Sequence, residues 1–125
     1  LRDYHDASEI RVIDYERVAE HVPTGERSHC VIMTHGHLAD ELVLRRLAGR
    51  HFGYLGMMGS RFKVAELFDR LATDGVPRAW LDRVSAPVGL QIGSQTPAEI
   101  AVSIAAELVR LRRQPESPDA NKGAS

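Results

Sequence analysis

Apolar and polar residues follow two patterns along the chain, and each pattern predicts a different element. Short apolar or β-branched runs at residues 9–13, 30–33 and 52–58 predict strands, and the last two are typical of strands buried on both faces. Apolar residues recur every three or four positions over residues 38–48 and again after Ser60, which predicts amphipathic helices. Strands alternating with helices of this length form parallel βαβ units, so the predicted fold class is α/β.

Capping and turn residues define where these elements begin and end. Asp14 is placed to cap a short helix over residues 15–22. Gly49 and Gly75 stand where the two amphipathic helices are expected to end, because glycine readily adopts the conformation that closes a helix. Residues 80–81 predict a short helical turn that packs on the core.

The last helix has the clearest start signal. The run Thr96-Pro97-Ala98-Glu99 offers a capping box with proline at the first helical position, and an apolar stripe continues to Leu111. A fourth, short strand is predicted at residues 88–90. The polar residues 114–125 predict a disordered tail that follows a single domain over residues 1–113.

Composition narrows the class of protein. The chain has 125 residues, 43% of them hydrophobic and 26% charged, as in one ordinary globular domain. A formal charge of −1 does not indicate nucleic acid or a membrane surface as a partner, and no apolar run is long enough to span a bilayer. Cys30, the only cysteine, is expected to be a buried structural thiol in a reducing, cytoplasmic setting. Asp40, Glu41 and Glu107 are assigned to solvated helix faces.

Three segments are expected to meet at the carboxyl ends of the strands, where open parallel sheets bind ligands. They are residues 34–37, 56–63 and 89–96. In the middle segment, glycines lead into a hydroxyl and two cations, a pattern that presents backbone N–H groups and positive charge to an anion. The sequence therefore predicts a phosphate-binding pocket, although the glycines could instead serve only to permit tight turns. The candidate binding residues are Thr34, His35, His37, Gly56, Gly59, Ser60, Arg61, Lys63, Gly89 and Gly93.

Two enzymatic alternatives stay open. Residues 34–37 begin like the metallo-β-lactamase signature, but Asp40 is one place late and no histidine follows His51, so we predict no metal site and keep a metal hydrolase as an alternative. A nicotinamide cofactor calls for Gly-x-Gly-x-x-Gly after a first strand. The chain has Gly-x-x-Gly-Ser over residues 56–60 instead, which leaves an NAD(P)-dependent oxidoreductase as the other alternative.

Four stretches of the chain resemble motifs of the XdhC/CoxI family. They lie at residues 33–41, 54–61, 87–93 and 96–107, and their order and spacing agree with the family over about residues 8–111. Members of that family are accessory proteins for xanthine dehydrogenase and related molybdenum hydroxylases. The similarity is to the family's C-terminal Rossmann-like domain.

The resemblance implies a Rossmann-like three-layer sandwich with a mostly parallel sheet. It also implies that the chain binds the molybdenum cofactor (molybdopterin), protects it during sulfuration and delivers it to the apo-hydroxylase. A molybdenum hydroxylase subunit and a sulfurtransferase are the implied partners, and the chain is expected to be an accessory protein with no catalytic residue. A degenerate protein-interaction module that has lost its ligand is a further alternative.

The chain departs from the family pattern in several places. The family's Gly-x-Gly-His segment and its N-terminal region with a functional cysteine are absent, so the usual first βαβ unit is expected to be missing and Cys30 does not inherit that role. Gln91 stands where the family often has Asp, and Phe62 where a basic residue is common. Because open sheet edges tend to be covered by another chain, we hypothesise a homo-oligomer or a fragment of a longer protein, and the start at Leu1 suggests truncation.

Overall fold

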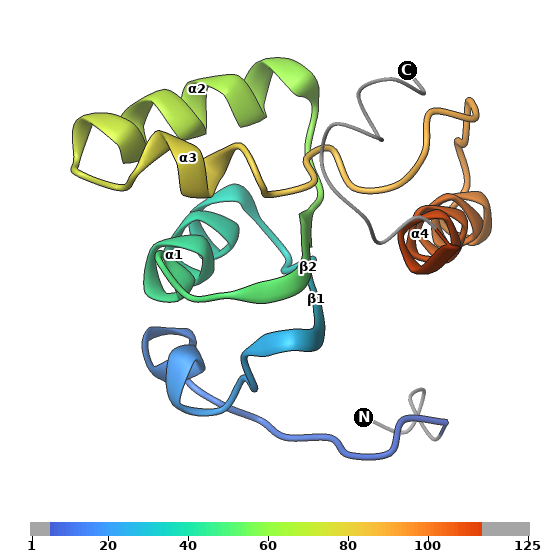
Figure 1. Ribbon diagram of the computed structural model, residues 1–125, viewed down its shortest axis with the longest axis horizontal. Coiled ribbons are helices and arrows are strands. Elements are labelled where there is room, and N and C mark those ends of the chain that lie inside the picture. Colours follow the sequence, from blue (N-terminus) through green and yellow to red (C-terminus); the bar gives the residue numbers. More distant parts are fainter. Residues whose placement is uncertain (1–5, 114–125) are drawn as a thin grey trace.

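Two parallel strands form the centre of the structure, with helices on both of their faces (Figure 1). The computed structural model describes residues 6–113, so the predicted tail at 114–125 lies outside the described residues. The elements, in chain order, are η2 (Tyr15–Glu20), β1 (Gly25–Ile32), α1 (His37–Leu47), β2 (Phe52–Met57), α2 (Arg61–Thr73), α3 (Arg78–Leu81) and α4 (Pro97–Arg113). This arrangement confirms the predicted α/β class.

Strand β1 is longer than its apolar residues suggest. It pairs in parallel with β2 from Gly25 opposite Phe52 to Ile32 opposite Met57. The prediction began this strand at Cys30, because residues 25–29 are mostly polar. Those residues are largely exposed in the structure, so pairing with β2 rather than burial makes them a strand.

The outer edge of β2 carries a short extended segment instead of the predicted strand at 88–90. Ser85 forms an isolated parallel bridge with Gly56, and its backbone carbonyl accepts from the Met57 N–H at 3.0 Å. The Val88 N–H then donates to the Met57 carbonyl at 3.0 Å. Gly89 has a φ of 94°, which no extended strand can contain, so the paired segment ends before it.

The predicted strand at 9–13 is wrong. These residues form no strand, and Ile10 and Val12 are 41% and 83% exposed, whereas Ile13 packs against the core. The alternation of apolar residues was present, but the segment has no neighbouring strand to pair with. Within residues 6–113 the outer edge of β1 also has no partner strand. Oligomer formation stays a prediction.

The helix signals were largely correct. Asp14 accepts a hydrogen bond from the Glu16 N–H at 3.1 Å and opens η2, which is a 3₁₀ helix. At the start of α4, the Thr96 hydroxyl accepts from the Glu99 N–H at 3.2 Å, and the Glu99 carboxylate accepts from the Thr96 N–H at 3.1 Å. This reciprocal pair is the predicted capping box.

The hydrophobic core lies between the sheet and the layer formed by α1, α2 and α3. Its fully buried side chains are Leu44, Leu47, Met57, Leu71 and Leu81. Trp80 packs against this core as predicted, and its indole N–H donates to the Arg50 carbonyl at 2.8 Å. Cys30 is partly buried beside the same core, and burial raises the pKa of its thiol.

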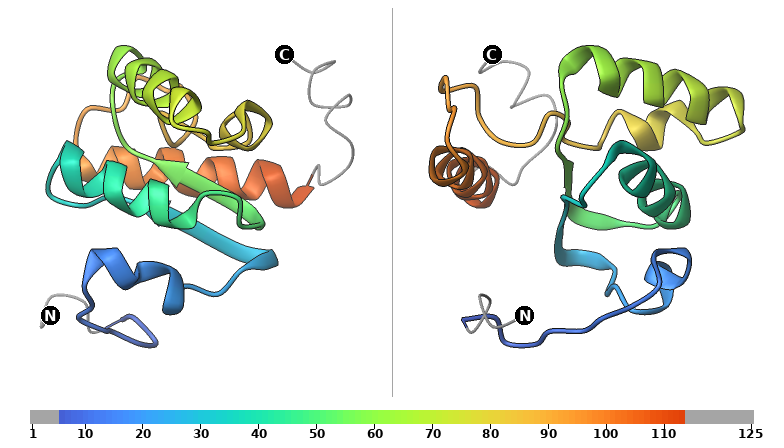
Figure 2. Two further views of the ribbon diagram at one scale, coloured as in Figure 1. Left: turned by 90° about the vertical axis from the view of Figure 1, so that its left-hand side faces the viewer. Right: turned by 180° about the vertical axis from the view of Figure 1, so that it is seen from behind.

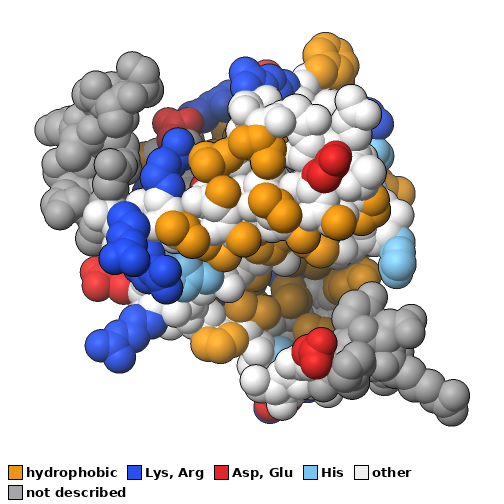
Figure 3. Space-filling view, turned by 90° about the vertical axis from the view of Figure 1, so that its right-hand side faces the viewer, with side chains coloured by type: hydrophobic (Ala, Val, Ile, Leu, Met, Phe, Trp, Pro, Cys, Tyr) orange, Lys and Arg blue, Asp and Glu red, His pale blue; other side chains and the backbone are white. Residues whose placement is uncertain are grey.

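Helix α4 covers the opposite face of the sheet (Figure 2). Ser103 is its one buried residue among those described, and Val102 and Val109 are 60% and 47% exposed. Viewed from the α4 side, hydrophobic side chains gather over this face of the molecule (Figure 3). No described helix combines the length and hydrophobicity of a membrane-spanning segment.

Candidate functional site

The three predicted segments meet at the carboxyl end of β2. A cleft of about 240 Å³ lies between the start of α1 and α2, and we call it the helix cleft. A second cleft, of about 290 Å³, lies between Gly59 and the loop over residues 87–94, and we call it the loop cleft. Met58 and Gly59 line both clefts, so the turn after β2 joins them.

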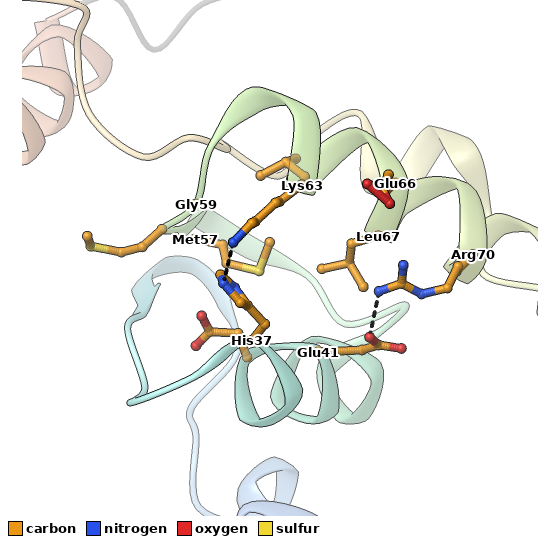
Figure 4. Close-up of a pocket in the computed structure, with 11 residues that line it drawn as sticks. His37, Glu41, Met57, Gly59, Lys63, Glu66, Leu67 and Arg70 are labelled. Carbon is orange, nitrogen blue, oxygen red and sulfur yellow. Dashed lines mark hydrogen bonds and ion pairs between the residues drawn. The ribbon is translucent and has the colours of Figure 1, made fainter.

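Charged side chains cross the helix cleft in two places (Figure 4). The Lys63 ammonium, in the first turn of α2, lies 3.0 Å from Nε2 of His37, the first residue of α1. Further along the two helices, the Arg70 guanidinium donates to the Glu41 carboxylate at 2.9 Å. Met57 and Leu67 contribute apolar surface between these two contacts.

The contact between Arg70 and Glu41 belongs to an ion-pair network that joins α1 to α2. Glu41 also accepts from Arg45 at 2.8 Å, and Arg45 pairs with Asp74 at 2.8 Å. The hydrogen bond from Arg70, with a further contribution from Arg45, holds the pKa of the Glu41 carboxyl below its ordinary value. Because Arg70 is already paired with a carboxylate, Lys63 is the cleft cation whose charge faces no acidic partner within residues 6–113. Glu41 is therefore not the freely solvated helix residue that was predicted.

At the start of α2, the N–H groups of Arg61 and Phe62 have no hydrogen-bond acceptor within residues 6–113. Gly59 has a φ of 142°, which turns the chain out of β2. Ser60 caps the helix as predicted, and its hydroxyl accepts from the Lys63 N–H at 3.3 Å. The Arg61 side chain is exposed, and among the described residues it has no hydrogen bond or ion pair. Arg61 lines neither the helix cleft nor the loop cleft, although it is the first residue of α2 and lies two positions after Gly59, which lines both.

Thr34 and Asp40 hold the loop before α1. Asp40 accepts from the Thr34 hydroxyl at 2.6 Å and from the Thr34 N–H at 2.9 Å, and it is only 8% exposed. The assignment of Asp40 to a solvated helix face is therefore wrong. His35 is exposed and lines neither the helix cleft nor the loop cleft, so only His37 of the two histidines faces Lys63.

The loop cleft is held by Glu107, which was wrongly assigned to solvent. Its half-buried carboxylate accepts hydrogen bonds from the Tyr54 hydroxyl, from the Ser85 hydroxyl at 2.9 Å and from the Gly89 N–H at 2.9 Å. Burial, and then the hydrogen bond to Glu107, raise the pKa of the Tyr54 phenol. These bonds tie α4 to β2 and to the loop that it borders.

Three of the candidate glycines act through packing or turn geometry. A Cβ on Gly89 would lie 2.3 Å from the Ser103 hydroxyl, and one on Gly56 would lie 2.5 Å from a Val88 methyl carbon. Gly93 has a φ of 76° and open space around it, so it serves the turn. The close approach of α4 to the loop therefore depends on Gly89.

The residues of the metal-hydrolase alternative have other partners in the structure. Over residues 6–113 no group of three or more His, Cys, Asp or Glu side chains is arranged to hold a metal ion. Nε2 of His37 faces a cation, and the Asp40 carboxylate is engaged by Thr34. The sequence analysis did not identify the polar residues Glu41, Arg70, Ser85, Ser103 and Glu107 as parts of the site. Ser103 and Glu107 are four residues apart within the apolar stripe of α4, and polar residues on a buried helix face indicate such a role.

A third cleft lies at the amino end of β2, whereas the other two lie at its carboxyl end. Arg50, His51, Trp80 and Arg83 contribute to its lining. It contains cationic side chains but no candidate residue from the three converging segments. We call it the amino-end cleft, and substitutions in it serve as controls for substitutions in the other two clefts.

The sequence is similar to one protein family and to two of its relatives in bacteria. A family profile described as the XdhC Rossmann domain matches residues 5–108. "Uncharacterized protein YqeB" from Escherichia coli (strain K12) is 37% identical over 73 residues, which are 58% of this chain and 14% of that protein. A protein from Bacillus subtilis (strain 168), named as a probable subunit of xanthine dehydrogenase, is 33% identical over 84 residues, which are 67% of this chain and 23% of that protein.

A solved structure agrees with the sequence matches. A protein described as a xanthine dehydrogenase from Bacillus halodurans matches with a TM-score of 0.70 and 32% identity, covering 94% of this chain and 34% of that one. The chain thus spans well under half the length of each of these relatives. Because the profile covers most of the sequence, the chain belongs to the XdhC family, and its fold is that family's Rossmann domain.

Proposed function

We propose that this chain is an accessory domain for the maturation of a xanthine dehydrogenase-type molybdenum hydroxylase. It would bind the molybdenum cofactor, or a related nucleotide or phosphate, for insertion into that enzyme. Membership of the XdhC family supports this role, as do the relatives whose names refer to xanthine dehydrogenase. A hydroxylase subunit and a sulfurtransferase are the proposed partners.

The observation that carries the proposal is the pair of joined clefts at the carboxyl end of β2. Lys63 supplies positive charge at the helix cleft, next to the backbone N–H groups at the start of α2, where the Arg61 side chain is exposed. Such a start binds phosphate because its N–H groups point at the ligand and the helix dipole favours negative charge. The residues present therefore fit the phosphate of a pterin cofactor.

The loop cleft fits a different part of the same ligand. Its lining over residues 87–94 contains no charged side chain, and the backbone of Gly93 is exposed. A neutral ring with several hydrogen-bonding groups, such as a pterin, would suit this lining. The cofactor supplies the metal chemistry of the enzyme that receives it, whereas the residues of this chain bind and orient it.

Binding of purified molybdopterin tests the proposal. A charge-assisted hydrogen bond contributes about 1.5–3 kcal/mol, so Lys63→Ala and Arg61→Ala should each weaken binding by about 10-fold or more. Arg83→Ala, which removes a cation from the amino-end cleft, should leave the dissociation constant unchanged. Retention of the pterin on gel filtration, followed by its fluorescence after oxidation, measures this.

Two results would count against this function. Equal binding by the parent and the two α2 variants would show that the ligand lies elsewhere. Stronger stabilisation of the chain by NAD(P) than by molybdopterin in a thermal-unfolding experiment would favour the oxidoreductase alternative.

A further inference from the structure

The contact between Lys63 and His37 can form in only one protonation state of the His37 ring. An ammonium group only donates hydrogen bonds, so Nε2 of His37 must be the unprotonated acceptor in the 3.0 Å contact. The imidazole is therefore neutral while the two side chains touch. Both residues are exposed, so solvent and small anions reach them.

Protonation of His37 would reverse this contact. The ring would become a cation facing a second cation across the helix cleft, and the hydrogen bond would be lost. An anion placed between two cations would accept a hydrogen bond from each and remove their repulsion.

None of the other charged side chains that line the helix cleft forms an ion pair with Lys63 or His37 among the described residues. Its titratable and charged lining consists of His37, Asp40 and Glu41 from α1, and of Lys63, Glu66 and Arg70 from α2, whereas β2 and the following turn contribute Met57, Met58 and Gly59. Asp40 is bonded to Thr34, and Glu41 is paired with Arg70 and Arg45. Glu66 is exposed, and no described residue forms an ion pair with it.

We propose that His37 and Lys63 together bind a tetrahedral oxyanion, and that one proton is taken up by His37 when the anion binds. The bound anion replaces the Lys63–His37 hydrogen bond with one bond from the ammonium and one from the imidazolium. No covalent bond changes, and the proton comes from solvent. This inference rests on the proposed function, because the anion would be the phosphate of the cofactor.

Sulfate is the probe, because it stays a dianion throughout the neutral pH range, so any proton taken up is bound by the protein. Calorimetric titration in two buffers of different ionisation enthalpy gives the number of protons bound per sulfate. At mildly alkaline pH we expect an uptake approaching one proton, and an affinity that falls by up to about tenfold per pH unit as pH rises.

Two histidine variants locate the proton. His37→Gln cannot titrate but keeps a polar group at this site, so it should bind sulfate with no proton uptake and no dependence on pH. His51→Gln, at the amino-end cleft, should behave like the parent. The ¹⁵N resonances of the His37 ring should change from the neutral to the imidazolium pattern as sulfate is added.

The outcomes separate the two proposals. Sulfate binding without proton uptake, or with uptake that survives in His37→Gln, would overturn the proton linkage and leave the phosphate site standing. Uptake lost in His51→Gln instead would overturn the assignment to this cleft. No sulfate binding by the parent would overturn both the linkage and the phosphate site, whereas sulfate binding with proton uptake but no molybdopterin binding would overturn only the proposed ligand.

Discussion

The two faces of the β1–β2 sheet are covered in different ways. On one face, α1, α2 and α3 pack through fully buried leucines such as Leu44 and Leu71. On the other face, Ser103 is the one buried residue of α4 among those described, and Glu107 of this helix accepts hydrogen bonds from Tyr54, Ser85 and Gly89. The first face derives its stability from apolar burial, whereas the second is positioned by a polar cluster.

This difference bears on the candidate site because each face builds one of the two clefts. The helix cleft lies on the tightly packed side, where ion pairs join α1 to α2. The loop cleft lies against α4, whose position depends on a few hydrogen bonds. We expect the loop cleft to be the more adaptable of the two, since few buried apolar contacts accompany low local stability.

The largest expected effect comes from removing core volume on the first face. Leu44→Ala should destabilise the chain by about 3–5 kcal/mol, because it loses transfer free energy and leaves a cavity. Val102→Ala on α4, which is 60% exposed, should cost less than about 0.5 kcal/mol. Urea unfolding followed by circular dichroism measures both, and equal costs would contradict the contrast between the faces.

Removing the carboxylate of Glu107 should have an intermediate effect. Glu107→Ala leaves the Gly89 N–H and two hydroxyls without their acceptor, which we expect to cost about 2–3 kcal/mol. Hydrogen exchange should quicken in α4 and in the loop over residues 87–94 before it does in α1. Arg110→Ala, an exposed change on the same helix, is the control, and uniform loss of protection across the chain would show that α4 is not held separately.

The smallest effect is a dependence of stability on alkaline pH. The pKa of Tyr54 is raised in the folded state, so the folded chain keeps this proton at a pH where the unfolded chain loses it. The Tyr54 contribution is fully present below about pH 10 and declines above that by at most about 1.4 kcal/mol per pH unit. Tyr54→Phe should abolish this decline, whereas Tyr15→Phe, an exposed position, should retain it.

The sequence predicted the parts of the fold that local chemistry determines. The capping groups of Asp14, Ser60 and Thr96 all accept the expected hydrogen bonds, because a cap needs only residues a few places apart. The strands were harder to predict, because a segment forms a strand only where a neighbouring strand pairs with it. Residues 9–13 show the alternating pattern without a partner strand, and the polar start of β1 forms a strand because β2 lies beside it.

The candidate site was predicted in outline for a similar reason. The rule that ligands bind at the carboxyl ends of parallel strands placed the three segments correctly around Met58 and Gly59. The rule could not show that Arg70 is neutralised by Glu41, or that Glu107 organises the loop. Those pairings join residues 29 positions apart in one case and 18 to 53 positions apart in the other, and nothing local records them.

The most direct measurement is a map of backbone amide chemical shifts during titration with sulfate. If an oxyanion binds at the carboxyl end of β2, the largest changes will fall on Gly59 to Lys63 and on His37, with smaller changes along the loop cleft. Changes centred instead on His51, Trp80 and Arg83 would place the anion in the amino-end cleft and contradict the account.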